Sequence, residues 1–268
     1  MTIQKTIFDL TDRVALVTGG ARGLGKAIAL GLARQGAGVA VVDSNGEGAE
    51  ETAAEVRALG REAGSWSCDV SKEEQVRKTV DEVVARFQKI DILVNNAGIT
   101  KRIALFDWRE SDWDEVIRVN QMGTFLVARA VGRHMVERRR GSIVNMSALG
   151  GGVVGLGRGN AIYCATKGAV AAMTRDLAAE WAQFGVRVNC VAPGWFKTEM
   201  NAALLKNPAL VERILDRVPL RKLGGPDDVV GPVVFLASDA AAMVTGHLLP
   251  IDGGVATIVS LSPEPVIG

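Results

Sequence analysis

The sequence predicts a single-domain α/β protein, built on a seven-stranded parallel sheet with helices on both faces. Short apolar runs alternate with amphipathic helical stretches along the chain, a pattern typical of parallel strands joined by right-handed crossover helices. The length of 268 residues fits one large domain. Hydrophobic residues make up 48% of the chain and charged residues 23%, so it can bury a large core. No repeat or linker divides it, and the domain is expected to span residues 1–268.

Seven short segments rich in Val, Ile, Leu and Ala are predicted as strands. Continuous apolar runs of this kind are typical of parallel strands, because helices cover both of their faces. In chain order, the predicted strands are residues 14–17, 39–42, 63–68, 90–94, 142–146, 186–192 and 247–251.

The stretches between these strands have apolar residues three or four positions apart, as amphipathic helices do. Ser71 is expected to cap the helix that follows it, with Glu74 completing a capping box. Residues 194–223 contain no clear strand and follow a strand end, so they are predicted to form a partly helical lid. The other helices are predicted after the first strand and at residues 47–59, 111–137, 161–184 and 227–237.

The net charge of +1 gives no general attraction to nucleic acid or to an acidic membrane surface. Cys68, Cys164 and Cys190 have no paired spacing, which indicates reduced thiols and a cytoplasmic protein. No signal peptide is visible, and no apolar stretch is long enough to cross a bilayer. His134 and His247 are the only histidines and belong to no ligand-like cluster, so no catalytic metal is expected.

A glycine-rich turn at residues 18–25 follows the first predicted strand. Its glycines allow a tight turn and let backbone N–H groups approach a pyrophosphate at the start of the next helix. Asp43 ends the second strand, close to the position from which a carboxylate bonds an adenosine ribose. The turn also matches the phosphate loop of nucleotide hydrolases, but Ala27 stands where that loop needs Ser or Thr to hold magnesium. The sequence therefore favours a dinucleotide site.

Tyr163 is the only tyrosine of the chain, and Lys167 follows it by four positions in a predicted helix. Residues at i and i+4 share a helix face, so the phenol and the ammonium should point into the same space. The ammonium favours the phenolate, and a phenol pKa lowered by ~3 units from ~10 would make Tyr163 a base for a hydroxyl proton. Ser147 ends the fifth strand and could bond the reacting oxygen. The three residues indicate oxidation of an alcohol or reduction of a carbonyl.

These motifs resemble those of the short-chain dehydrogenase/reductase family over residues 14–254. The resemblance implies a single Rossmann domain that binds NAD or NADP and exchanges hydride with a carbonyl or hydroxyl carbon. It also implies a homotetramer in which the helices at 111–137 and 161–184 pack against their copies. The matching pieces are the turn at 18–25, Asp69-Val70, Asn95-Asn96-Ala97-Gly98, Asn120, Ser147, Tyr163-x-x-x-Lys167 and Pro193-Gly194 with Thr198.

The resemblance also assigns roles to single residues. Asn120 is expected to hold a water that links Lys167 to solvent, and it completes a catalytic set with Ser147 and Tyr163. The pair at 69–70 is expected to contact adenine, and the residues after the sixth strand to cover the nicotinamide end. The expected cofactor-binding residues are Gly19, Arg22, Gly23, Leu24, Gly25, Asp43, Asp69, Val70, Asn96, Gly98, Tyr163, Lys167, Pro193, Gly194 and Thr198.

Asp43 also bears on the choice of cofactor, because its carboxylate would repel a 2′-phosphate. NAD is therefore expected over NADP, although Arg22 could reach such a phosphate from the turn. An alternative function is the reduction of 3-oxoacyl groups on a carrier. The expected preference for NAD disfavours it, because reductive biosynthesis commonly uses NADP. Another alternative, a cofactor-binding regulator without turnover, is disfavoured by the intact Ser147, Tyr163 and Lys167.

Within the family, the chain resembles gluconate 5-dehydrogenases and related sugar dehydrogenases at residues 8–10, 95–102, 193–200 and 246–254. By that resemblance Arg102 would face the substrate, where an arginine could pair with a carboxylate. Arg158, in the lengthened loop before Tyr163, is a second candidate. Leu149 stands two positions after Ser147, where a hydroxyl could have bonded a sugar. The predicted substrate is a sugar or sugar acid.

Overall fold

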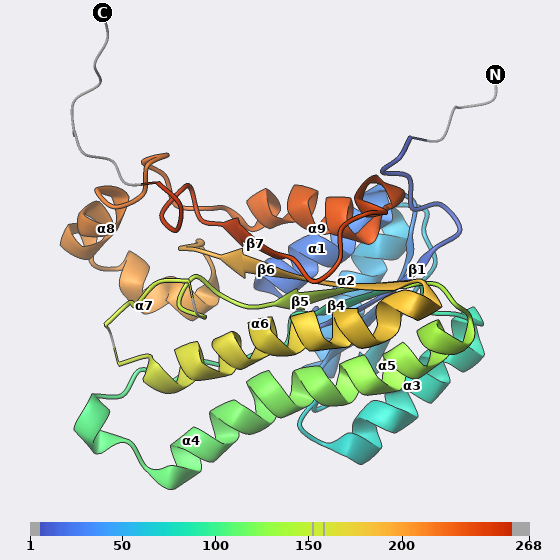
Figure 1. Ribbon diagram of the computed structural model, residues 1–268, viewed down its shortest axis with the longest axis horizontal. Helices are drawn as coiled ribbons and strands as arrows, with labels where there is room; N and C mark the ends of the chain where they lie inside the picture. Colours follow the sequence, from blue (N-terminus) through green and yellow to red (C-terminus); the bar gives the residue numbers. More distant parts are fainter. Residues whose placement is uncertain (1–5, 152, 158, 259–268) are drawn as a thin grey trace, which may run out of the picture.

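The computed structural model describes residues 6–151, 153–157 and 159–258 (Figure 1). One sheet of seven parallel strands runs through them in the order β3-β2-β1-β4-β5-β6-β7, which confirms the predicted architecture. Each strand begins and ends within two residues of its predicted bounds. The strands are β1 (Val14–Thr18), β2 (Gly38–Asp43), β3 (Ala63–Ser67), β4 (Ile92–Asn95), β5 (Gly141–Met146), β6 (Val186–Pro193) and β7 (Leu248–Ile251).

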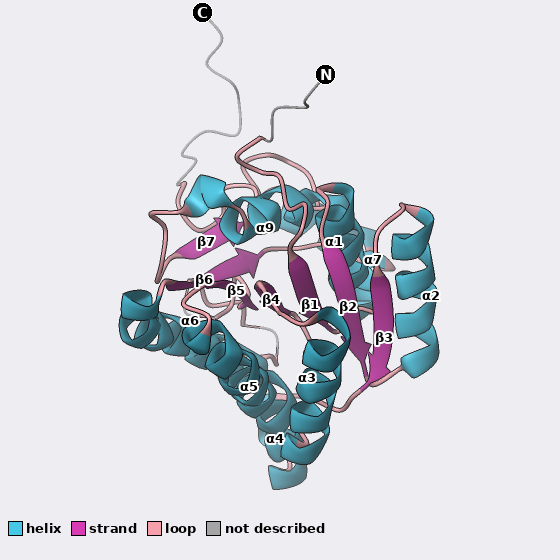
Figure 2. Ribbon diagram, turned by 90° about the vertical axis from the view of Figure 1, so that its right-hand side faces the viewer, coloured by secondary structure: helices cyan, strands magenta, loops and turns pink. Residues whose placement is uncertain are grey.

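Helices cover both faces of the sheet, because alternate strand residues are apolar on both sides. In β1, Ala15 and Val17 belong to one buried cluster and Val14 and Leu16 to the other. Figure 2 shows the two helical layers with the sheet between them. One layer contains α1 (Gly23–Arg34), α2 (Gly46–Ala58) and α9 (Val230–Ala237), and the other contains α3 (Glu73–Phe87), α5 (Thr124–Glu137) and α6 (Ala161–Trp181).

The strand order reverses direction at the pair β1 and β4. The chain winds outward from β1 through β2 to β3, and then returns to place β4 on the other side of β1. Such a reversal separates the loops that leave the carboxyl ends of the two central strands. A crevice therefore opens beyond these ends, between the glycine turn after β1 and the loop after β4.

The helical region predicted at 111–137 is continuous but not uniform. It consists of α4 (Glu110–Ile117), a π-helical turn (Arg118–Gly123) and α5. Short π-helical stretches inside α-helices occur frequently at functional sites. Asn120 lies in this turn and is fully buried.

Residues 194–223 are partly helical, as predicted, with α7 (Ala202–Leu205) and α8 (Pro208–Leu215). They have a small apolar cluster of their own, made by Leu204, Ile214, Val218 and Leu223. The function of this segment as a lid remains a prediction.

The predicted cap of α3 is wrong. The N-cap position is Lys72, not Ser71, and it makes no capping side-chain bond. The backbone N–H of Ser71 instead donates to the carboxylate of Asp69, 2.9 Å away. An aspartate that bonds the backbone two residues on forms its own turn, and this turn moves the start of the helix beyond Ser71.

Candidate active site

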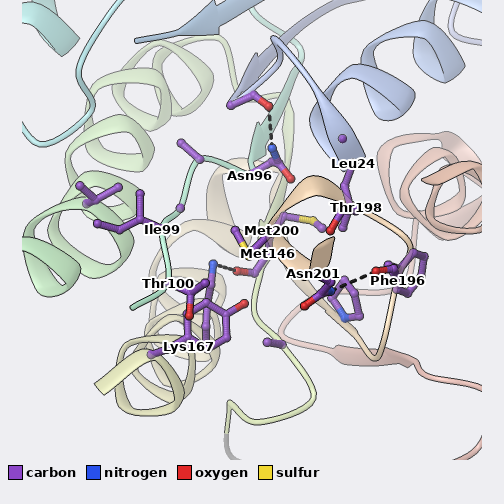
Figure 3. A pocket seen from close by; sticks show the side chains of 18 of the residues that line it. Leu24, Asn96, Ile99, Thr100, Met146, Lys167, Phe196, Thr198, Met200 and Asn201 are labelled. Atoms are coloured by element: carbon purple, nitrogen blue, oxygen red, sulfur yellow. Dashed lines mark hydrogen bonds between the residues drawn. The ribbon is translucent and has the colours of Figure 1, made fainter. Parts of the chain in front are cut away.

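A cavity of about 870 Å³ opens at the carboxyl ends of the central strands (Figure 3). It collects most of the predicted site residues, which come from the glycine turn, five strand ends, α6 and the lid. Gly25 and Asn120 are not part of its wall, and Arg158 lies outside the described residues. The predicted residues that line the cavity are Gly19, Arg22, Gly23, Leu24, Asp43, Asp69, Val70, Asn96, Gly98, Arg102, Ser147, Tyr163, Lys167, Pro193, Gly194 and Thr198.

The glycine turn forms one wall almost entirely from backbone. Gly19 and Gly23 have φ of 65° and 56°, values that L side chains rarely adopt. A Cβ at Gly25 would lie 1.9 Å from the carbonyl oxygen of Gly19, so no side chain fits between the turn and α1. Arg22 occupies the N-cap of α1 without a side-chain capping bond. The first N–H groups of this helix are therefore available to an anion in the cavity.

Asp43 is held beside this turn by two backbone hydrogen bonds. Its Oδ2 accepts from the N–H of Ala21 at 3.0 Å, and its Oδ1 accepts from the N–H of Asn45 at 2.9 Å. A carboxylate has about four acceptor sites, so each oxygen can still take a further donor. The carboxylate is thus fixed at the end of β2 with acceptor capacity facing the cavity.

Asn96 connects the loop after β4 to the glycine turn. Its Nδ2 donates to the carbonyl oxygens of Thr18 and Gly19, at 3.0 and 2.9 Å. The hydroxyl of Thr18 accepts in return from the backbone N–H groups of Asn96 and Ala97. These bonds fix the floor of the crevice between β1 and β4.

Ser147, Tyr163 and Lys167 meet at the ends of β5 and α6. Ser147 and Lys167 are both buried, and the Lys167 Nζ lies 5.9 Å from the centroid of the Tyr163 ring. The Ser147 hydroxyl donates to the carbonyl oxygen of Lys167 at 2.8 Å. The Lys167 ammonium donates to the carbonyl oxygen of Met146 at 2.7 Å (Figure 3). The predicted juxtaposition of the three side chains is present.

The protein surroundings alone do not lower the pKa of Tyr163. Loss of hydration raises it to about 12, and only the nearby Arg102 guanidinium opposes this. Burial also lowers the pKa of Lys167 to about 8, because a charged ammonium is costly away from water. The fall in the phenol pKa that is expected from Lys167 together with a positively charged nicotinamide stays a prediction. For both groups, loss of hydration is the largest cause of the pKa shift.

Asn120 lies behind the cavity wall. Its Oδ1 accepts from the N–H of Ile99 at 2.8 Å, and its Nδ2 donates to the Ile99 carbonyl and to the Thr166 hydroxyl. A Cβ at Gly98 would lie 3.2 Å from the Asn120 Oδ1 and 3.4 Å from the Lys167 Nζ. A side chain at Gly98 would therefore be in tight contact with both polar groups. Asn120 fastens the loop after β4 to α6.

Two arginines that line the cavity bond η4 (Glu199–Asn201), the first turn of the segment 194–223. Arg22 pairs with Glu199 at 2.5 Å, and both side chains are largely exposed. The Arg102 guanidinium donates to the Asn201 Oδ1 at 2.9 Å. The Asn201 Nδ2 in turn donates to the carbonyl of Phe196 (Figure 3).

Sequence reasoning missed several cavity residues, and only some of them carried a signal. Glu199 and Asn201 lie in the predicted lid just after Thr198, so their position in the lid could have marked them. Nothing in the sequence pattern distinguished the apolar ones from core residues. The missed residues with side chains at the cavity include Leu156, Asn160, Trp195, Phe196, Glu199, Met200, Asn201 and Leu204.

Neither a metal site nor a membrane-spanning helix is found among the described residues. Within 6–151, 153–157 and 159–258, no three His, Cys, Asp or Glu side chains are grouped so that they could hold a metal ion. In the same part of the chain, no helix is long and apolar enough to cross a membrane.

Comparisons with known proteins agree with this geometry. A family model described as enoyl-(acyl carrier protein) reductase matches residues 19–256. The chain is 43% identical over 254 residues to the 2-dehydro-3-deoxy-D-gluconate 5-dehydrogenase of Pseudoalteromonas atlantica, with 92% of this chain and 97% of that protein covered. It is 38% identical over 245 residues to a 3-oxoacyl-[acyl-carrier-protein] reductase of Staphylococcus epidermidis, with 91% and 99% covered.

A solved structure gives the same result. The crystal structure of a gluconate 5-dehydrogenase from Burkholderia cenocepacia, in complex with NADP and tartrate, matches with a TM-score of 0.90 at 41% identity. The match covers 94% of this chain and 98% of that one. The chain belongs to the short-chain dehydrogenase/reductase family and is an NAD(P)-dependent oxidoreductase.

Proposed function

We propose that the chain transfers hydride between NAD and a secondary alcohol or ketone of a sugar acid of the gluconate type. The observation that carries this proposal is the position of Arg102, which lines the same cavity as Ser147, Tyr163 and Lys167. A guanidinium there can pair with a substrate carboxylate while the reacting carbon lies beside the phenol. Two of the relatives are named for gluconate or a gluconate derivative, which supports the same class of substrate.

The cavity wall fits a nicotinamide dinucleotide, which supplies hydride transfer when bound. Gly19 and Gly23 line the cavity at the start of α1, where the first N–H groups of the helix can bind a pyrophosphate. Asp43 can accept from ribose hydroxyls, and its charge opposes a 2′-phosphate, which is the argument for NAD. Because the Burkholderia cenocepacia structure contains NADP, the experiment below compares both cofactors.

In the proposed reaction, Tyr163 exchanges the proton of the substrate hydroxyl. With a pKa of about 12 the phenol is protonated at neutral pH, so it can donate a proton to a ketone directly. Oxidation requires the phenolate, which the neighbouring Arg102 guanidinium favours. The Ser147 hydroxyl reaches the substrate oxygen after rotating away from the Lys167 carbonyl. Asn120 holds the loop at Gly98 in place beside the ammonium, where a water could pass the proton on.

The alternative substrate is a 3-oxoacyl group on a carrier, for which the Staphylococcus epidermidis relative is named. An acyl chain needs an apolar wall and no carboxylate partner. Arg102 and the Asp43 preference for NAD both favour the sugar acid. A regulator without turnover would not require the buried Ser147 and Lys167.

We also propose that the enzyme is a homotetramer in the cytoplasm. Apolar or small side chains lie exposed on α4, the π-helical turn, the start of α5 and the outer face of α6, as a helix interface between copies requires. Ala165 and Ala172 of α6 are exposed and so do not pack against their own sheet, whereas Ala169 is half-buried. The three free cysteines are consistent with a reducing compartment. The exposed residues concerned are Trp113, Met122, Phe125, Ala165 and Ala172.

Arg102→Ala tests the substrate class. D-gluconate and D-glucitol differ in the carboxylate, so they are compared as substrates with each of NAD and NADP. The wild-type enzyme should prefer gluconate, and Arg102→Ala should raise the KM for gluconate about tenfold, since charge-assisted contacts contribute ~1.5–3 kcal/mol. The variant should affect glucitol far less. Equal kcat/KM for both compounds, unchanged by the substitution, would exclude the proposal, and turnover of a 3-oxoacyl thioester would favour the alternative.

A further inference from the structure

The turn η4 holds both cavity arginines, but it does so with partners of different charge. Glu199 bonds Arg22 with a carboxylate, whereas Asn201 bonds Arg102 with a neutral amide. The first partner cancels the charge of its arginine, and the second leaves that charge in place. We propose that Glu199 and Asn201 are specificity-determining residues, which disfavour a phosphate at the adenosine end of the cavity and favour a carboxylate at the substrate end.

The geometry of the turn lets two nearby residues act at opposite ends. In a 3₁₀-helix each residue turns the chain by about 120°, so side chains two positions apart diverge widely. The backbone holds this turn in place, since Asn201 donates to the Thr198 carbonyl at 3.0 Å. The Thr198 side chain also lies 4.0 Å from a Cβ built on Gly23, which places η4 against the glycine turn.

At the adenosine end, Arg22 shares the cavity with several carboxylates and pairs with Glu199. It shares the cavity wall with Asp43 and Ser44, but the described ion pair is with Glu199. A phosphate on the ribose would need this guanidinium as its cation, because Asp43 is repulsive. Glu199 competes for it, and the bound arginine is turned toward the lid. Glu199 therefore adds to the preference for NAD that Asp43 establishes.

At the substrate end, the Asn201 amide has a fixed orientation. Its Nδ2 donates to the Phe196 carbonyl at 3.0 Å, so its Oδ1 faces the guanidinium of Arg102. An amide accepts one hydrogen bond from the arginine and leaves the other donors and the full charge for a ligand. A carboxylate at this position would compete with a substrate carboxylate for the same guanidinium. This half of the inference rests on the proposed sugar-acid substrate.

Two isosteric substitutions with opposite changes of charge test the inference, and each is the control for the other. Glu199→Gln frees Arg22, so the ratio of NADP to NAD in kcat/KM should rise about two- to fivefold, the range that an exposed ion pair controls. Asn201→Asp neutralises Arg102, so the KM for D-gluconate should rise about tenfold while that for D-glucitol changes little. Asn201→Ala removes the support without adding charge and should have a smaller effect than Asn201→Asp.

The test depends on whether each variant changes only its own parameter, the cofactor ratio or the KM for gluconate. The inference holds if Glu199→Gln shifts only the cofactor ratio, Asn201→Asp shifts only the gluconate KM, and Asn201→Asp has no further effect in an Arg102→Ala background. It is overturned if either variant leaves its own parameter unchanged or if both variants shift both parameters. Dissociation constants of NAD and NADP, measured from tryptophan fluorescence without substrate, test the Glu199 half independently. If gluconate is not a substrate, the proposed function and the Asn201 half fail together, and the cofactor measurement still decides on Glu199.

Discussion

Two hydrogen bonds, one from Ser147 and one from Lys167, connect the end of β5 to α6. The Ser147 hydroxyl donates to the carbonyl of Lys167 at 2.8 Å, and the Lys167 ammonium donates to the carbonyl of Met146 at 2.7 Å, one residue before Ser147. The end of β5 is thereby locked to the second turn of α6. Tyr163 stands one turn earlier on this helix, so its position relative to Ser147 is set by the same two bonds.

Tyr163→Phe tests the proton-transfer group. The ring and its packing remain, and only the ionisable oxygen is removed. We expect turnover to fall by ~10²- to 10⁴-fold, the usual contribution of a general acid or base, while NAD binding is retained. Steady-state kinetics and cofactor titration measure the two quantities, and near-normal turnover would refute the role of the phenol.

Lys167 should make stability depend on pH in a defined window. Its pKa is about 8 in the folded protein and ~10.4 in an unfolded chain. Between these values the unfolded chain binds the extra proton, so the free energy of unfolding should rise as pH increases from 8 to 10. The expected gain is about 1–3 kcal/mol, since one pKa unit corresponds to ~1.4 kcal/mol.

Lys167→Met is the control for this pH effect, because it removes the titrating group. Urea unfolding at fixed protein concentration, from pH 7 to 10, should show the rise in the wild type and a flatter curve in the variant. Above pH 10 the sign reverses, because Tyr163 keeps its proton up to about 12 when folded and loses it near 10 when unfolded. Parallel curves for the two proteins below pH 10 would contradict the assignment.

Asp43→Ala together with Ser44→Arg should shift preference toward NADP. The change removes a repulsive carboxylate and adds a cation for the 2′-phosphate. It also leaves the N–H groups of Ala21 and Asn45 without their partner, so the free energy of unfolding should fall by about 1–2 kcal/mol. The ratio of kcat/KM for the two cofactors is the measurement. A wild-type enzyme that already prefers NADP would show that the interpretation of Asp43 is wrong.

Ala172→Glu should weaken the proposed tetramer, because it places a charge on the exposed outer face of α6. Ala54→Glu on α2 is the matched control, since Ala54 is also exposed but lies in the opposite helical layer. Light scattering at micromolar concentration should give four chains for the wild type and the control, and fewer for Ala172→Glu. A wild-type mass of one chain would refute the assembly.

The sequence predicted the sheet and the meeting of Ser147, Tyr163 and Lys167, because both depend on strong local patterns. Buried strands appear as apolar runs, and parallel strands bring their ends to one edge. The helix face shared by Tyr163 and Lys167 follows from a spacing of four. These features need no knowledge of how distant side chains pack.

The features that could not be predicted depend on distant contacts or on competition. Burial raises the pKa of Tyr163, and its extent follows from packing that the spacing to Lys167 does not contain. Asn120 lies in a π-helical turn and bonds Ile99 and Thr166, which are distant in sequence. Ser71 loses its predicted cap to a competing turn made by Asp69. Asn201 bonds Arg102 because the fold brings together two residues that are far apart in sequence.

The reversal of strand order at β1 and β4 also has a consequence for the stability of the folded chain. Asp43 and the glycine turn belong to the half of the sheet built first along the chain, and the residues around Tyr163 belong to the other half. Within the sheet, the two halves pair where β1 lies beside β4, through Ala15–Ile92, Leu16–Leu93 and Val17–Val94. A dinucleotide bound across the ends of β1 and β4 would contact residues of both halves. A ligand at a hundredfold excess over its Kd raises the free energy of unfolding by about 2.7 kcal/mol. The bound cofactor would therefore stabilise the fold at the point where the strand order reverses.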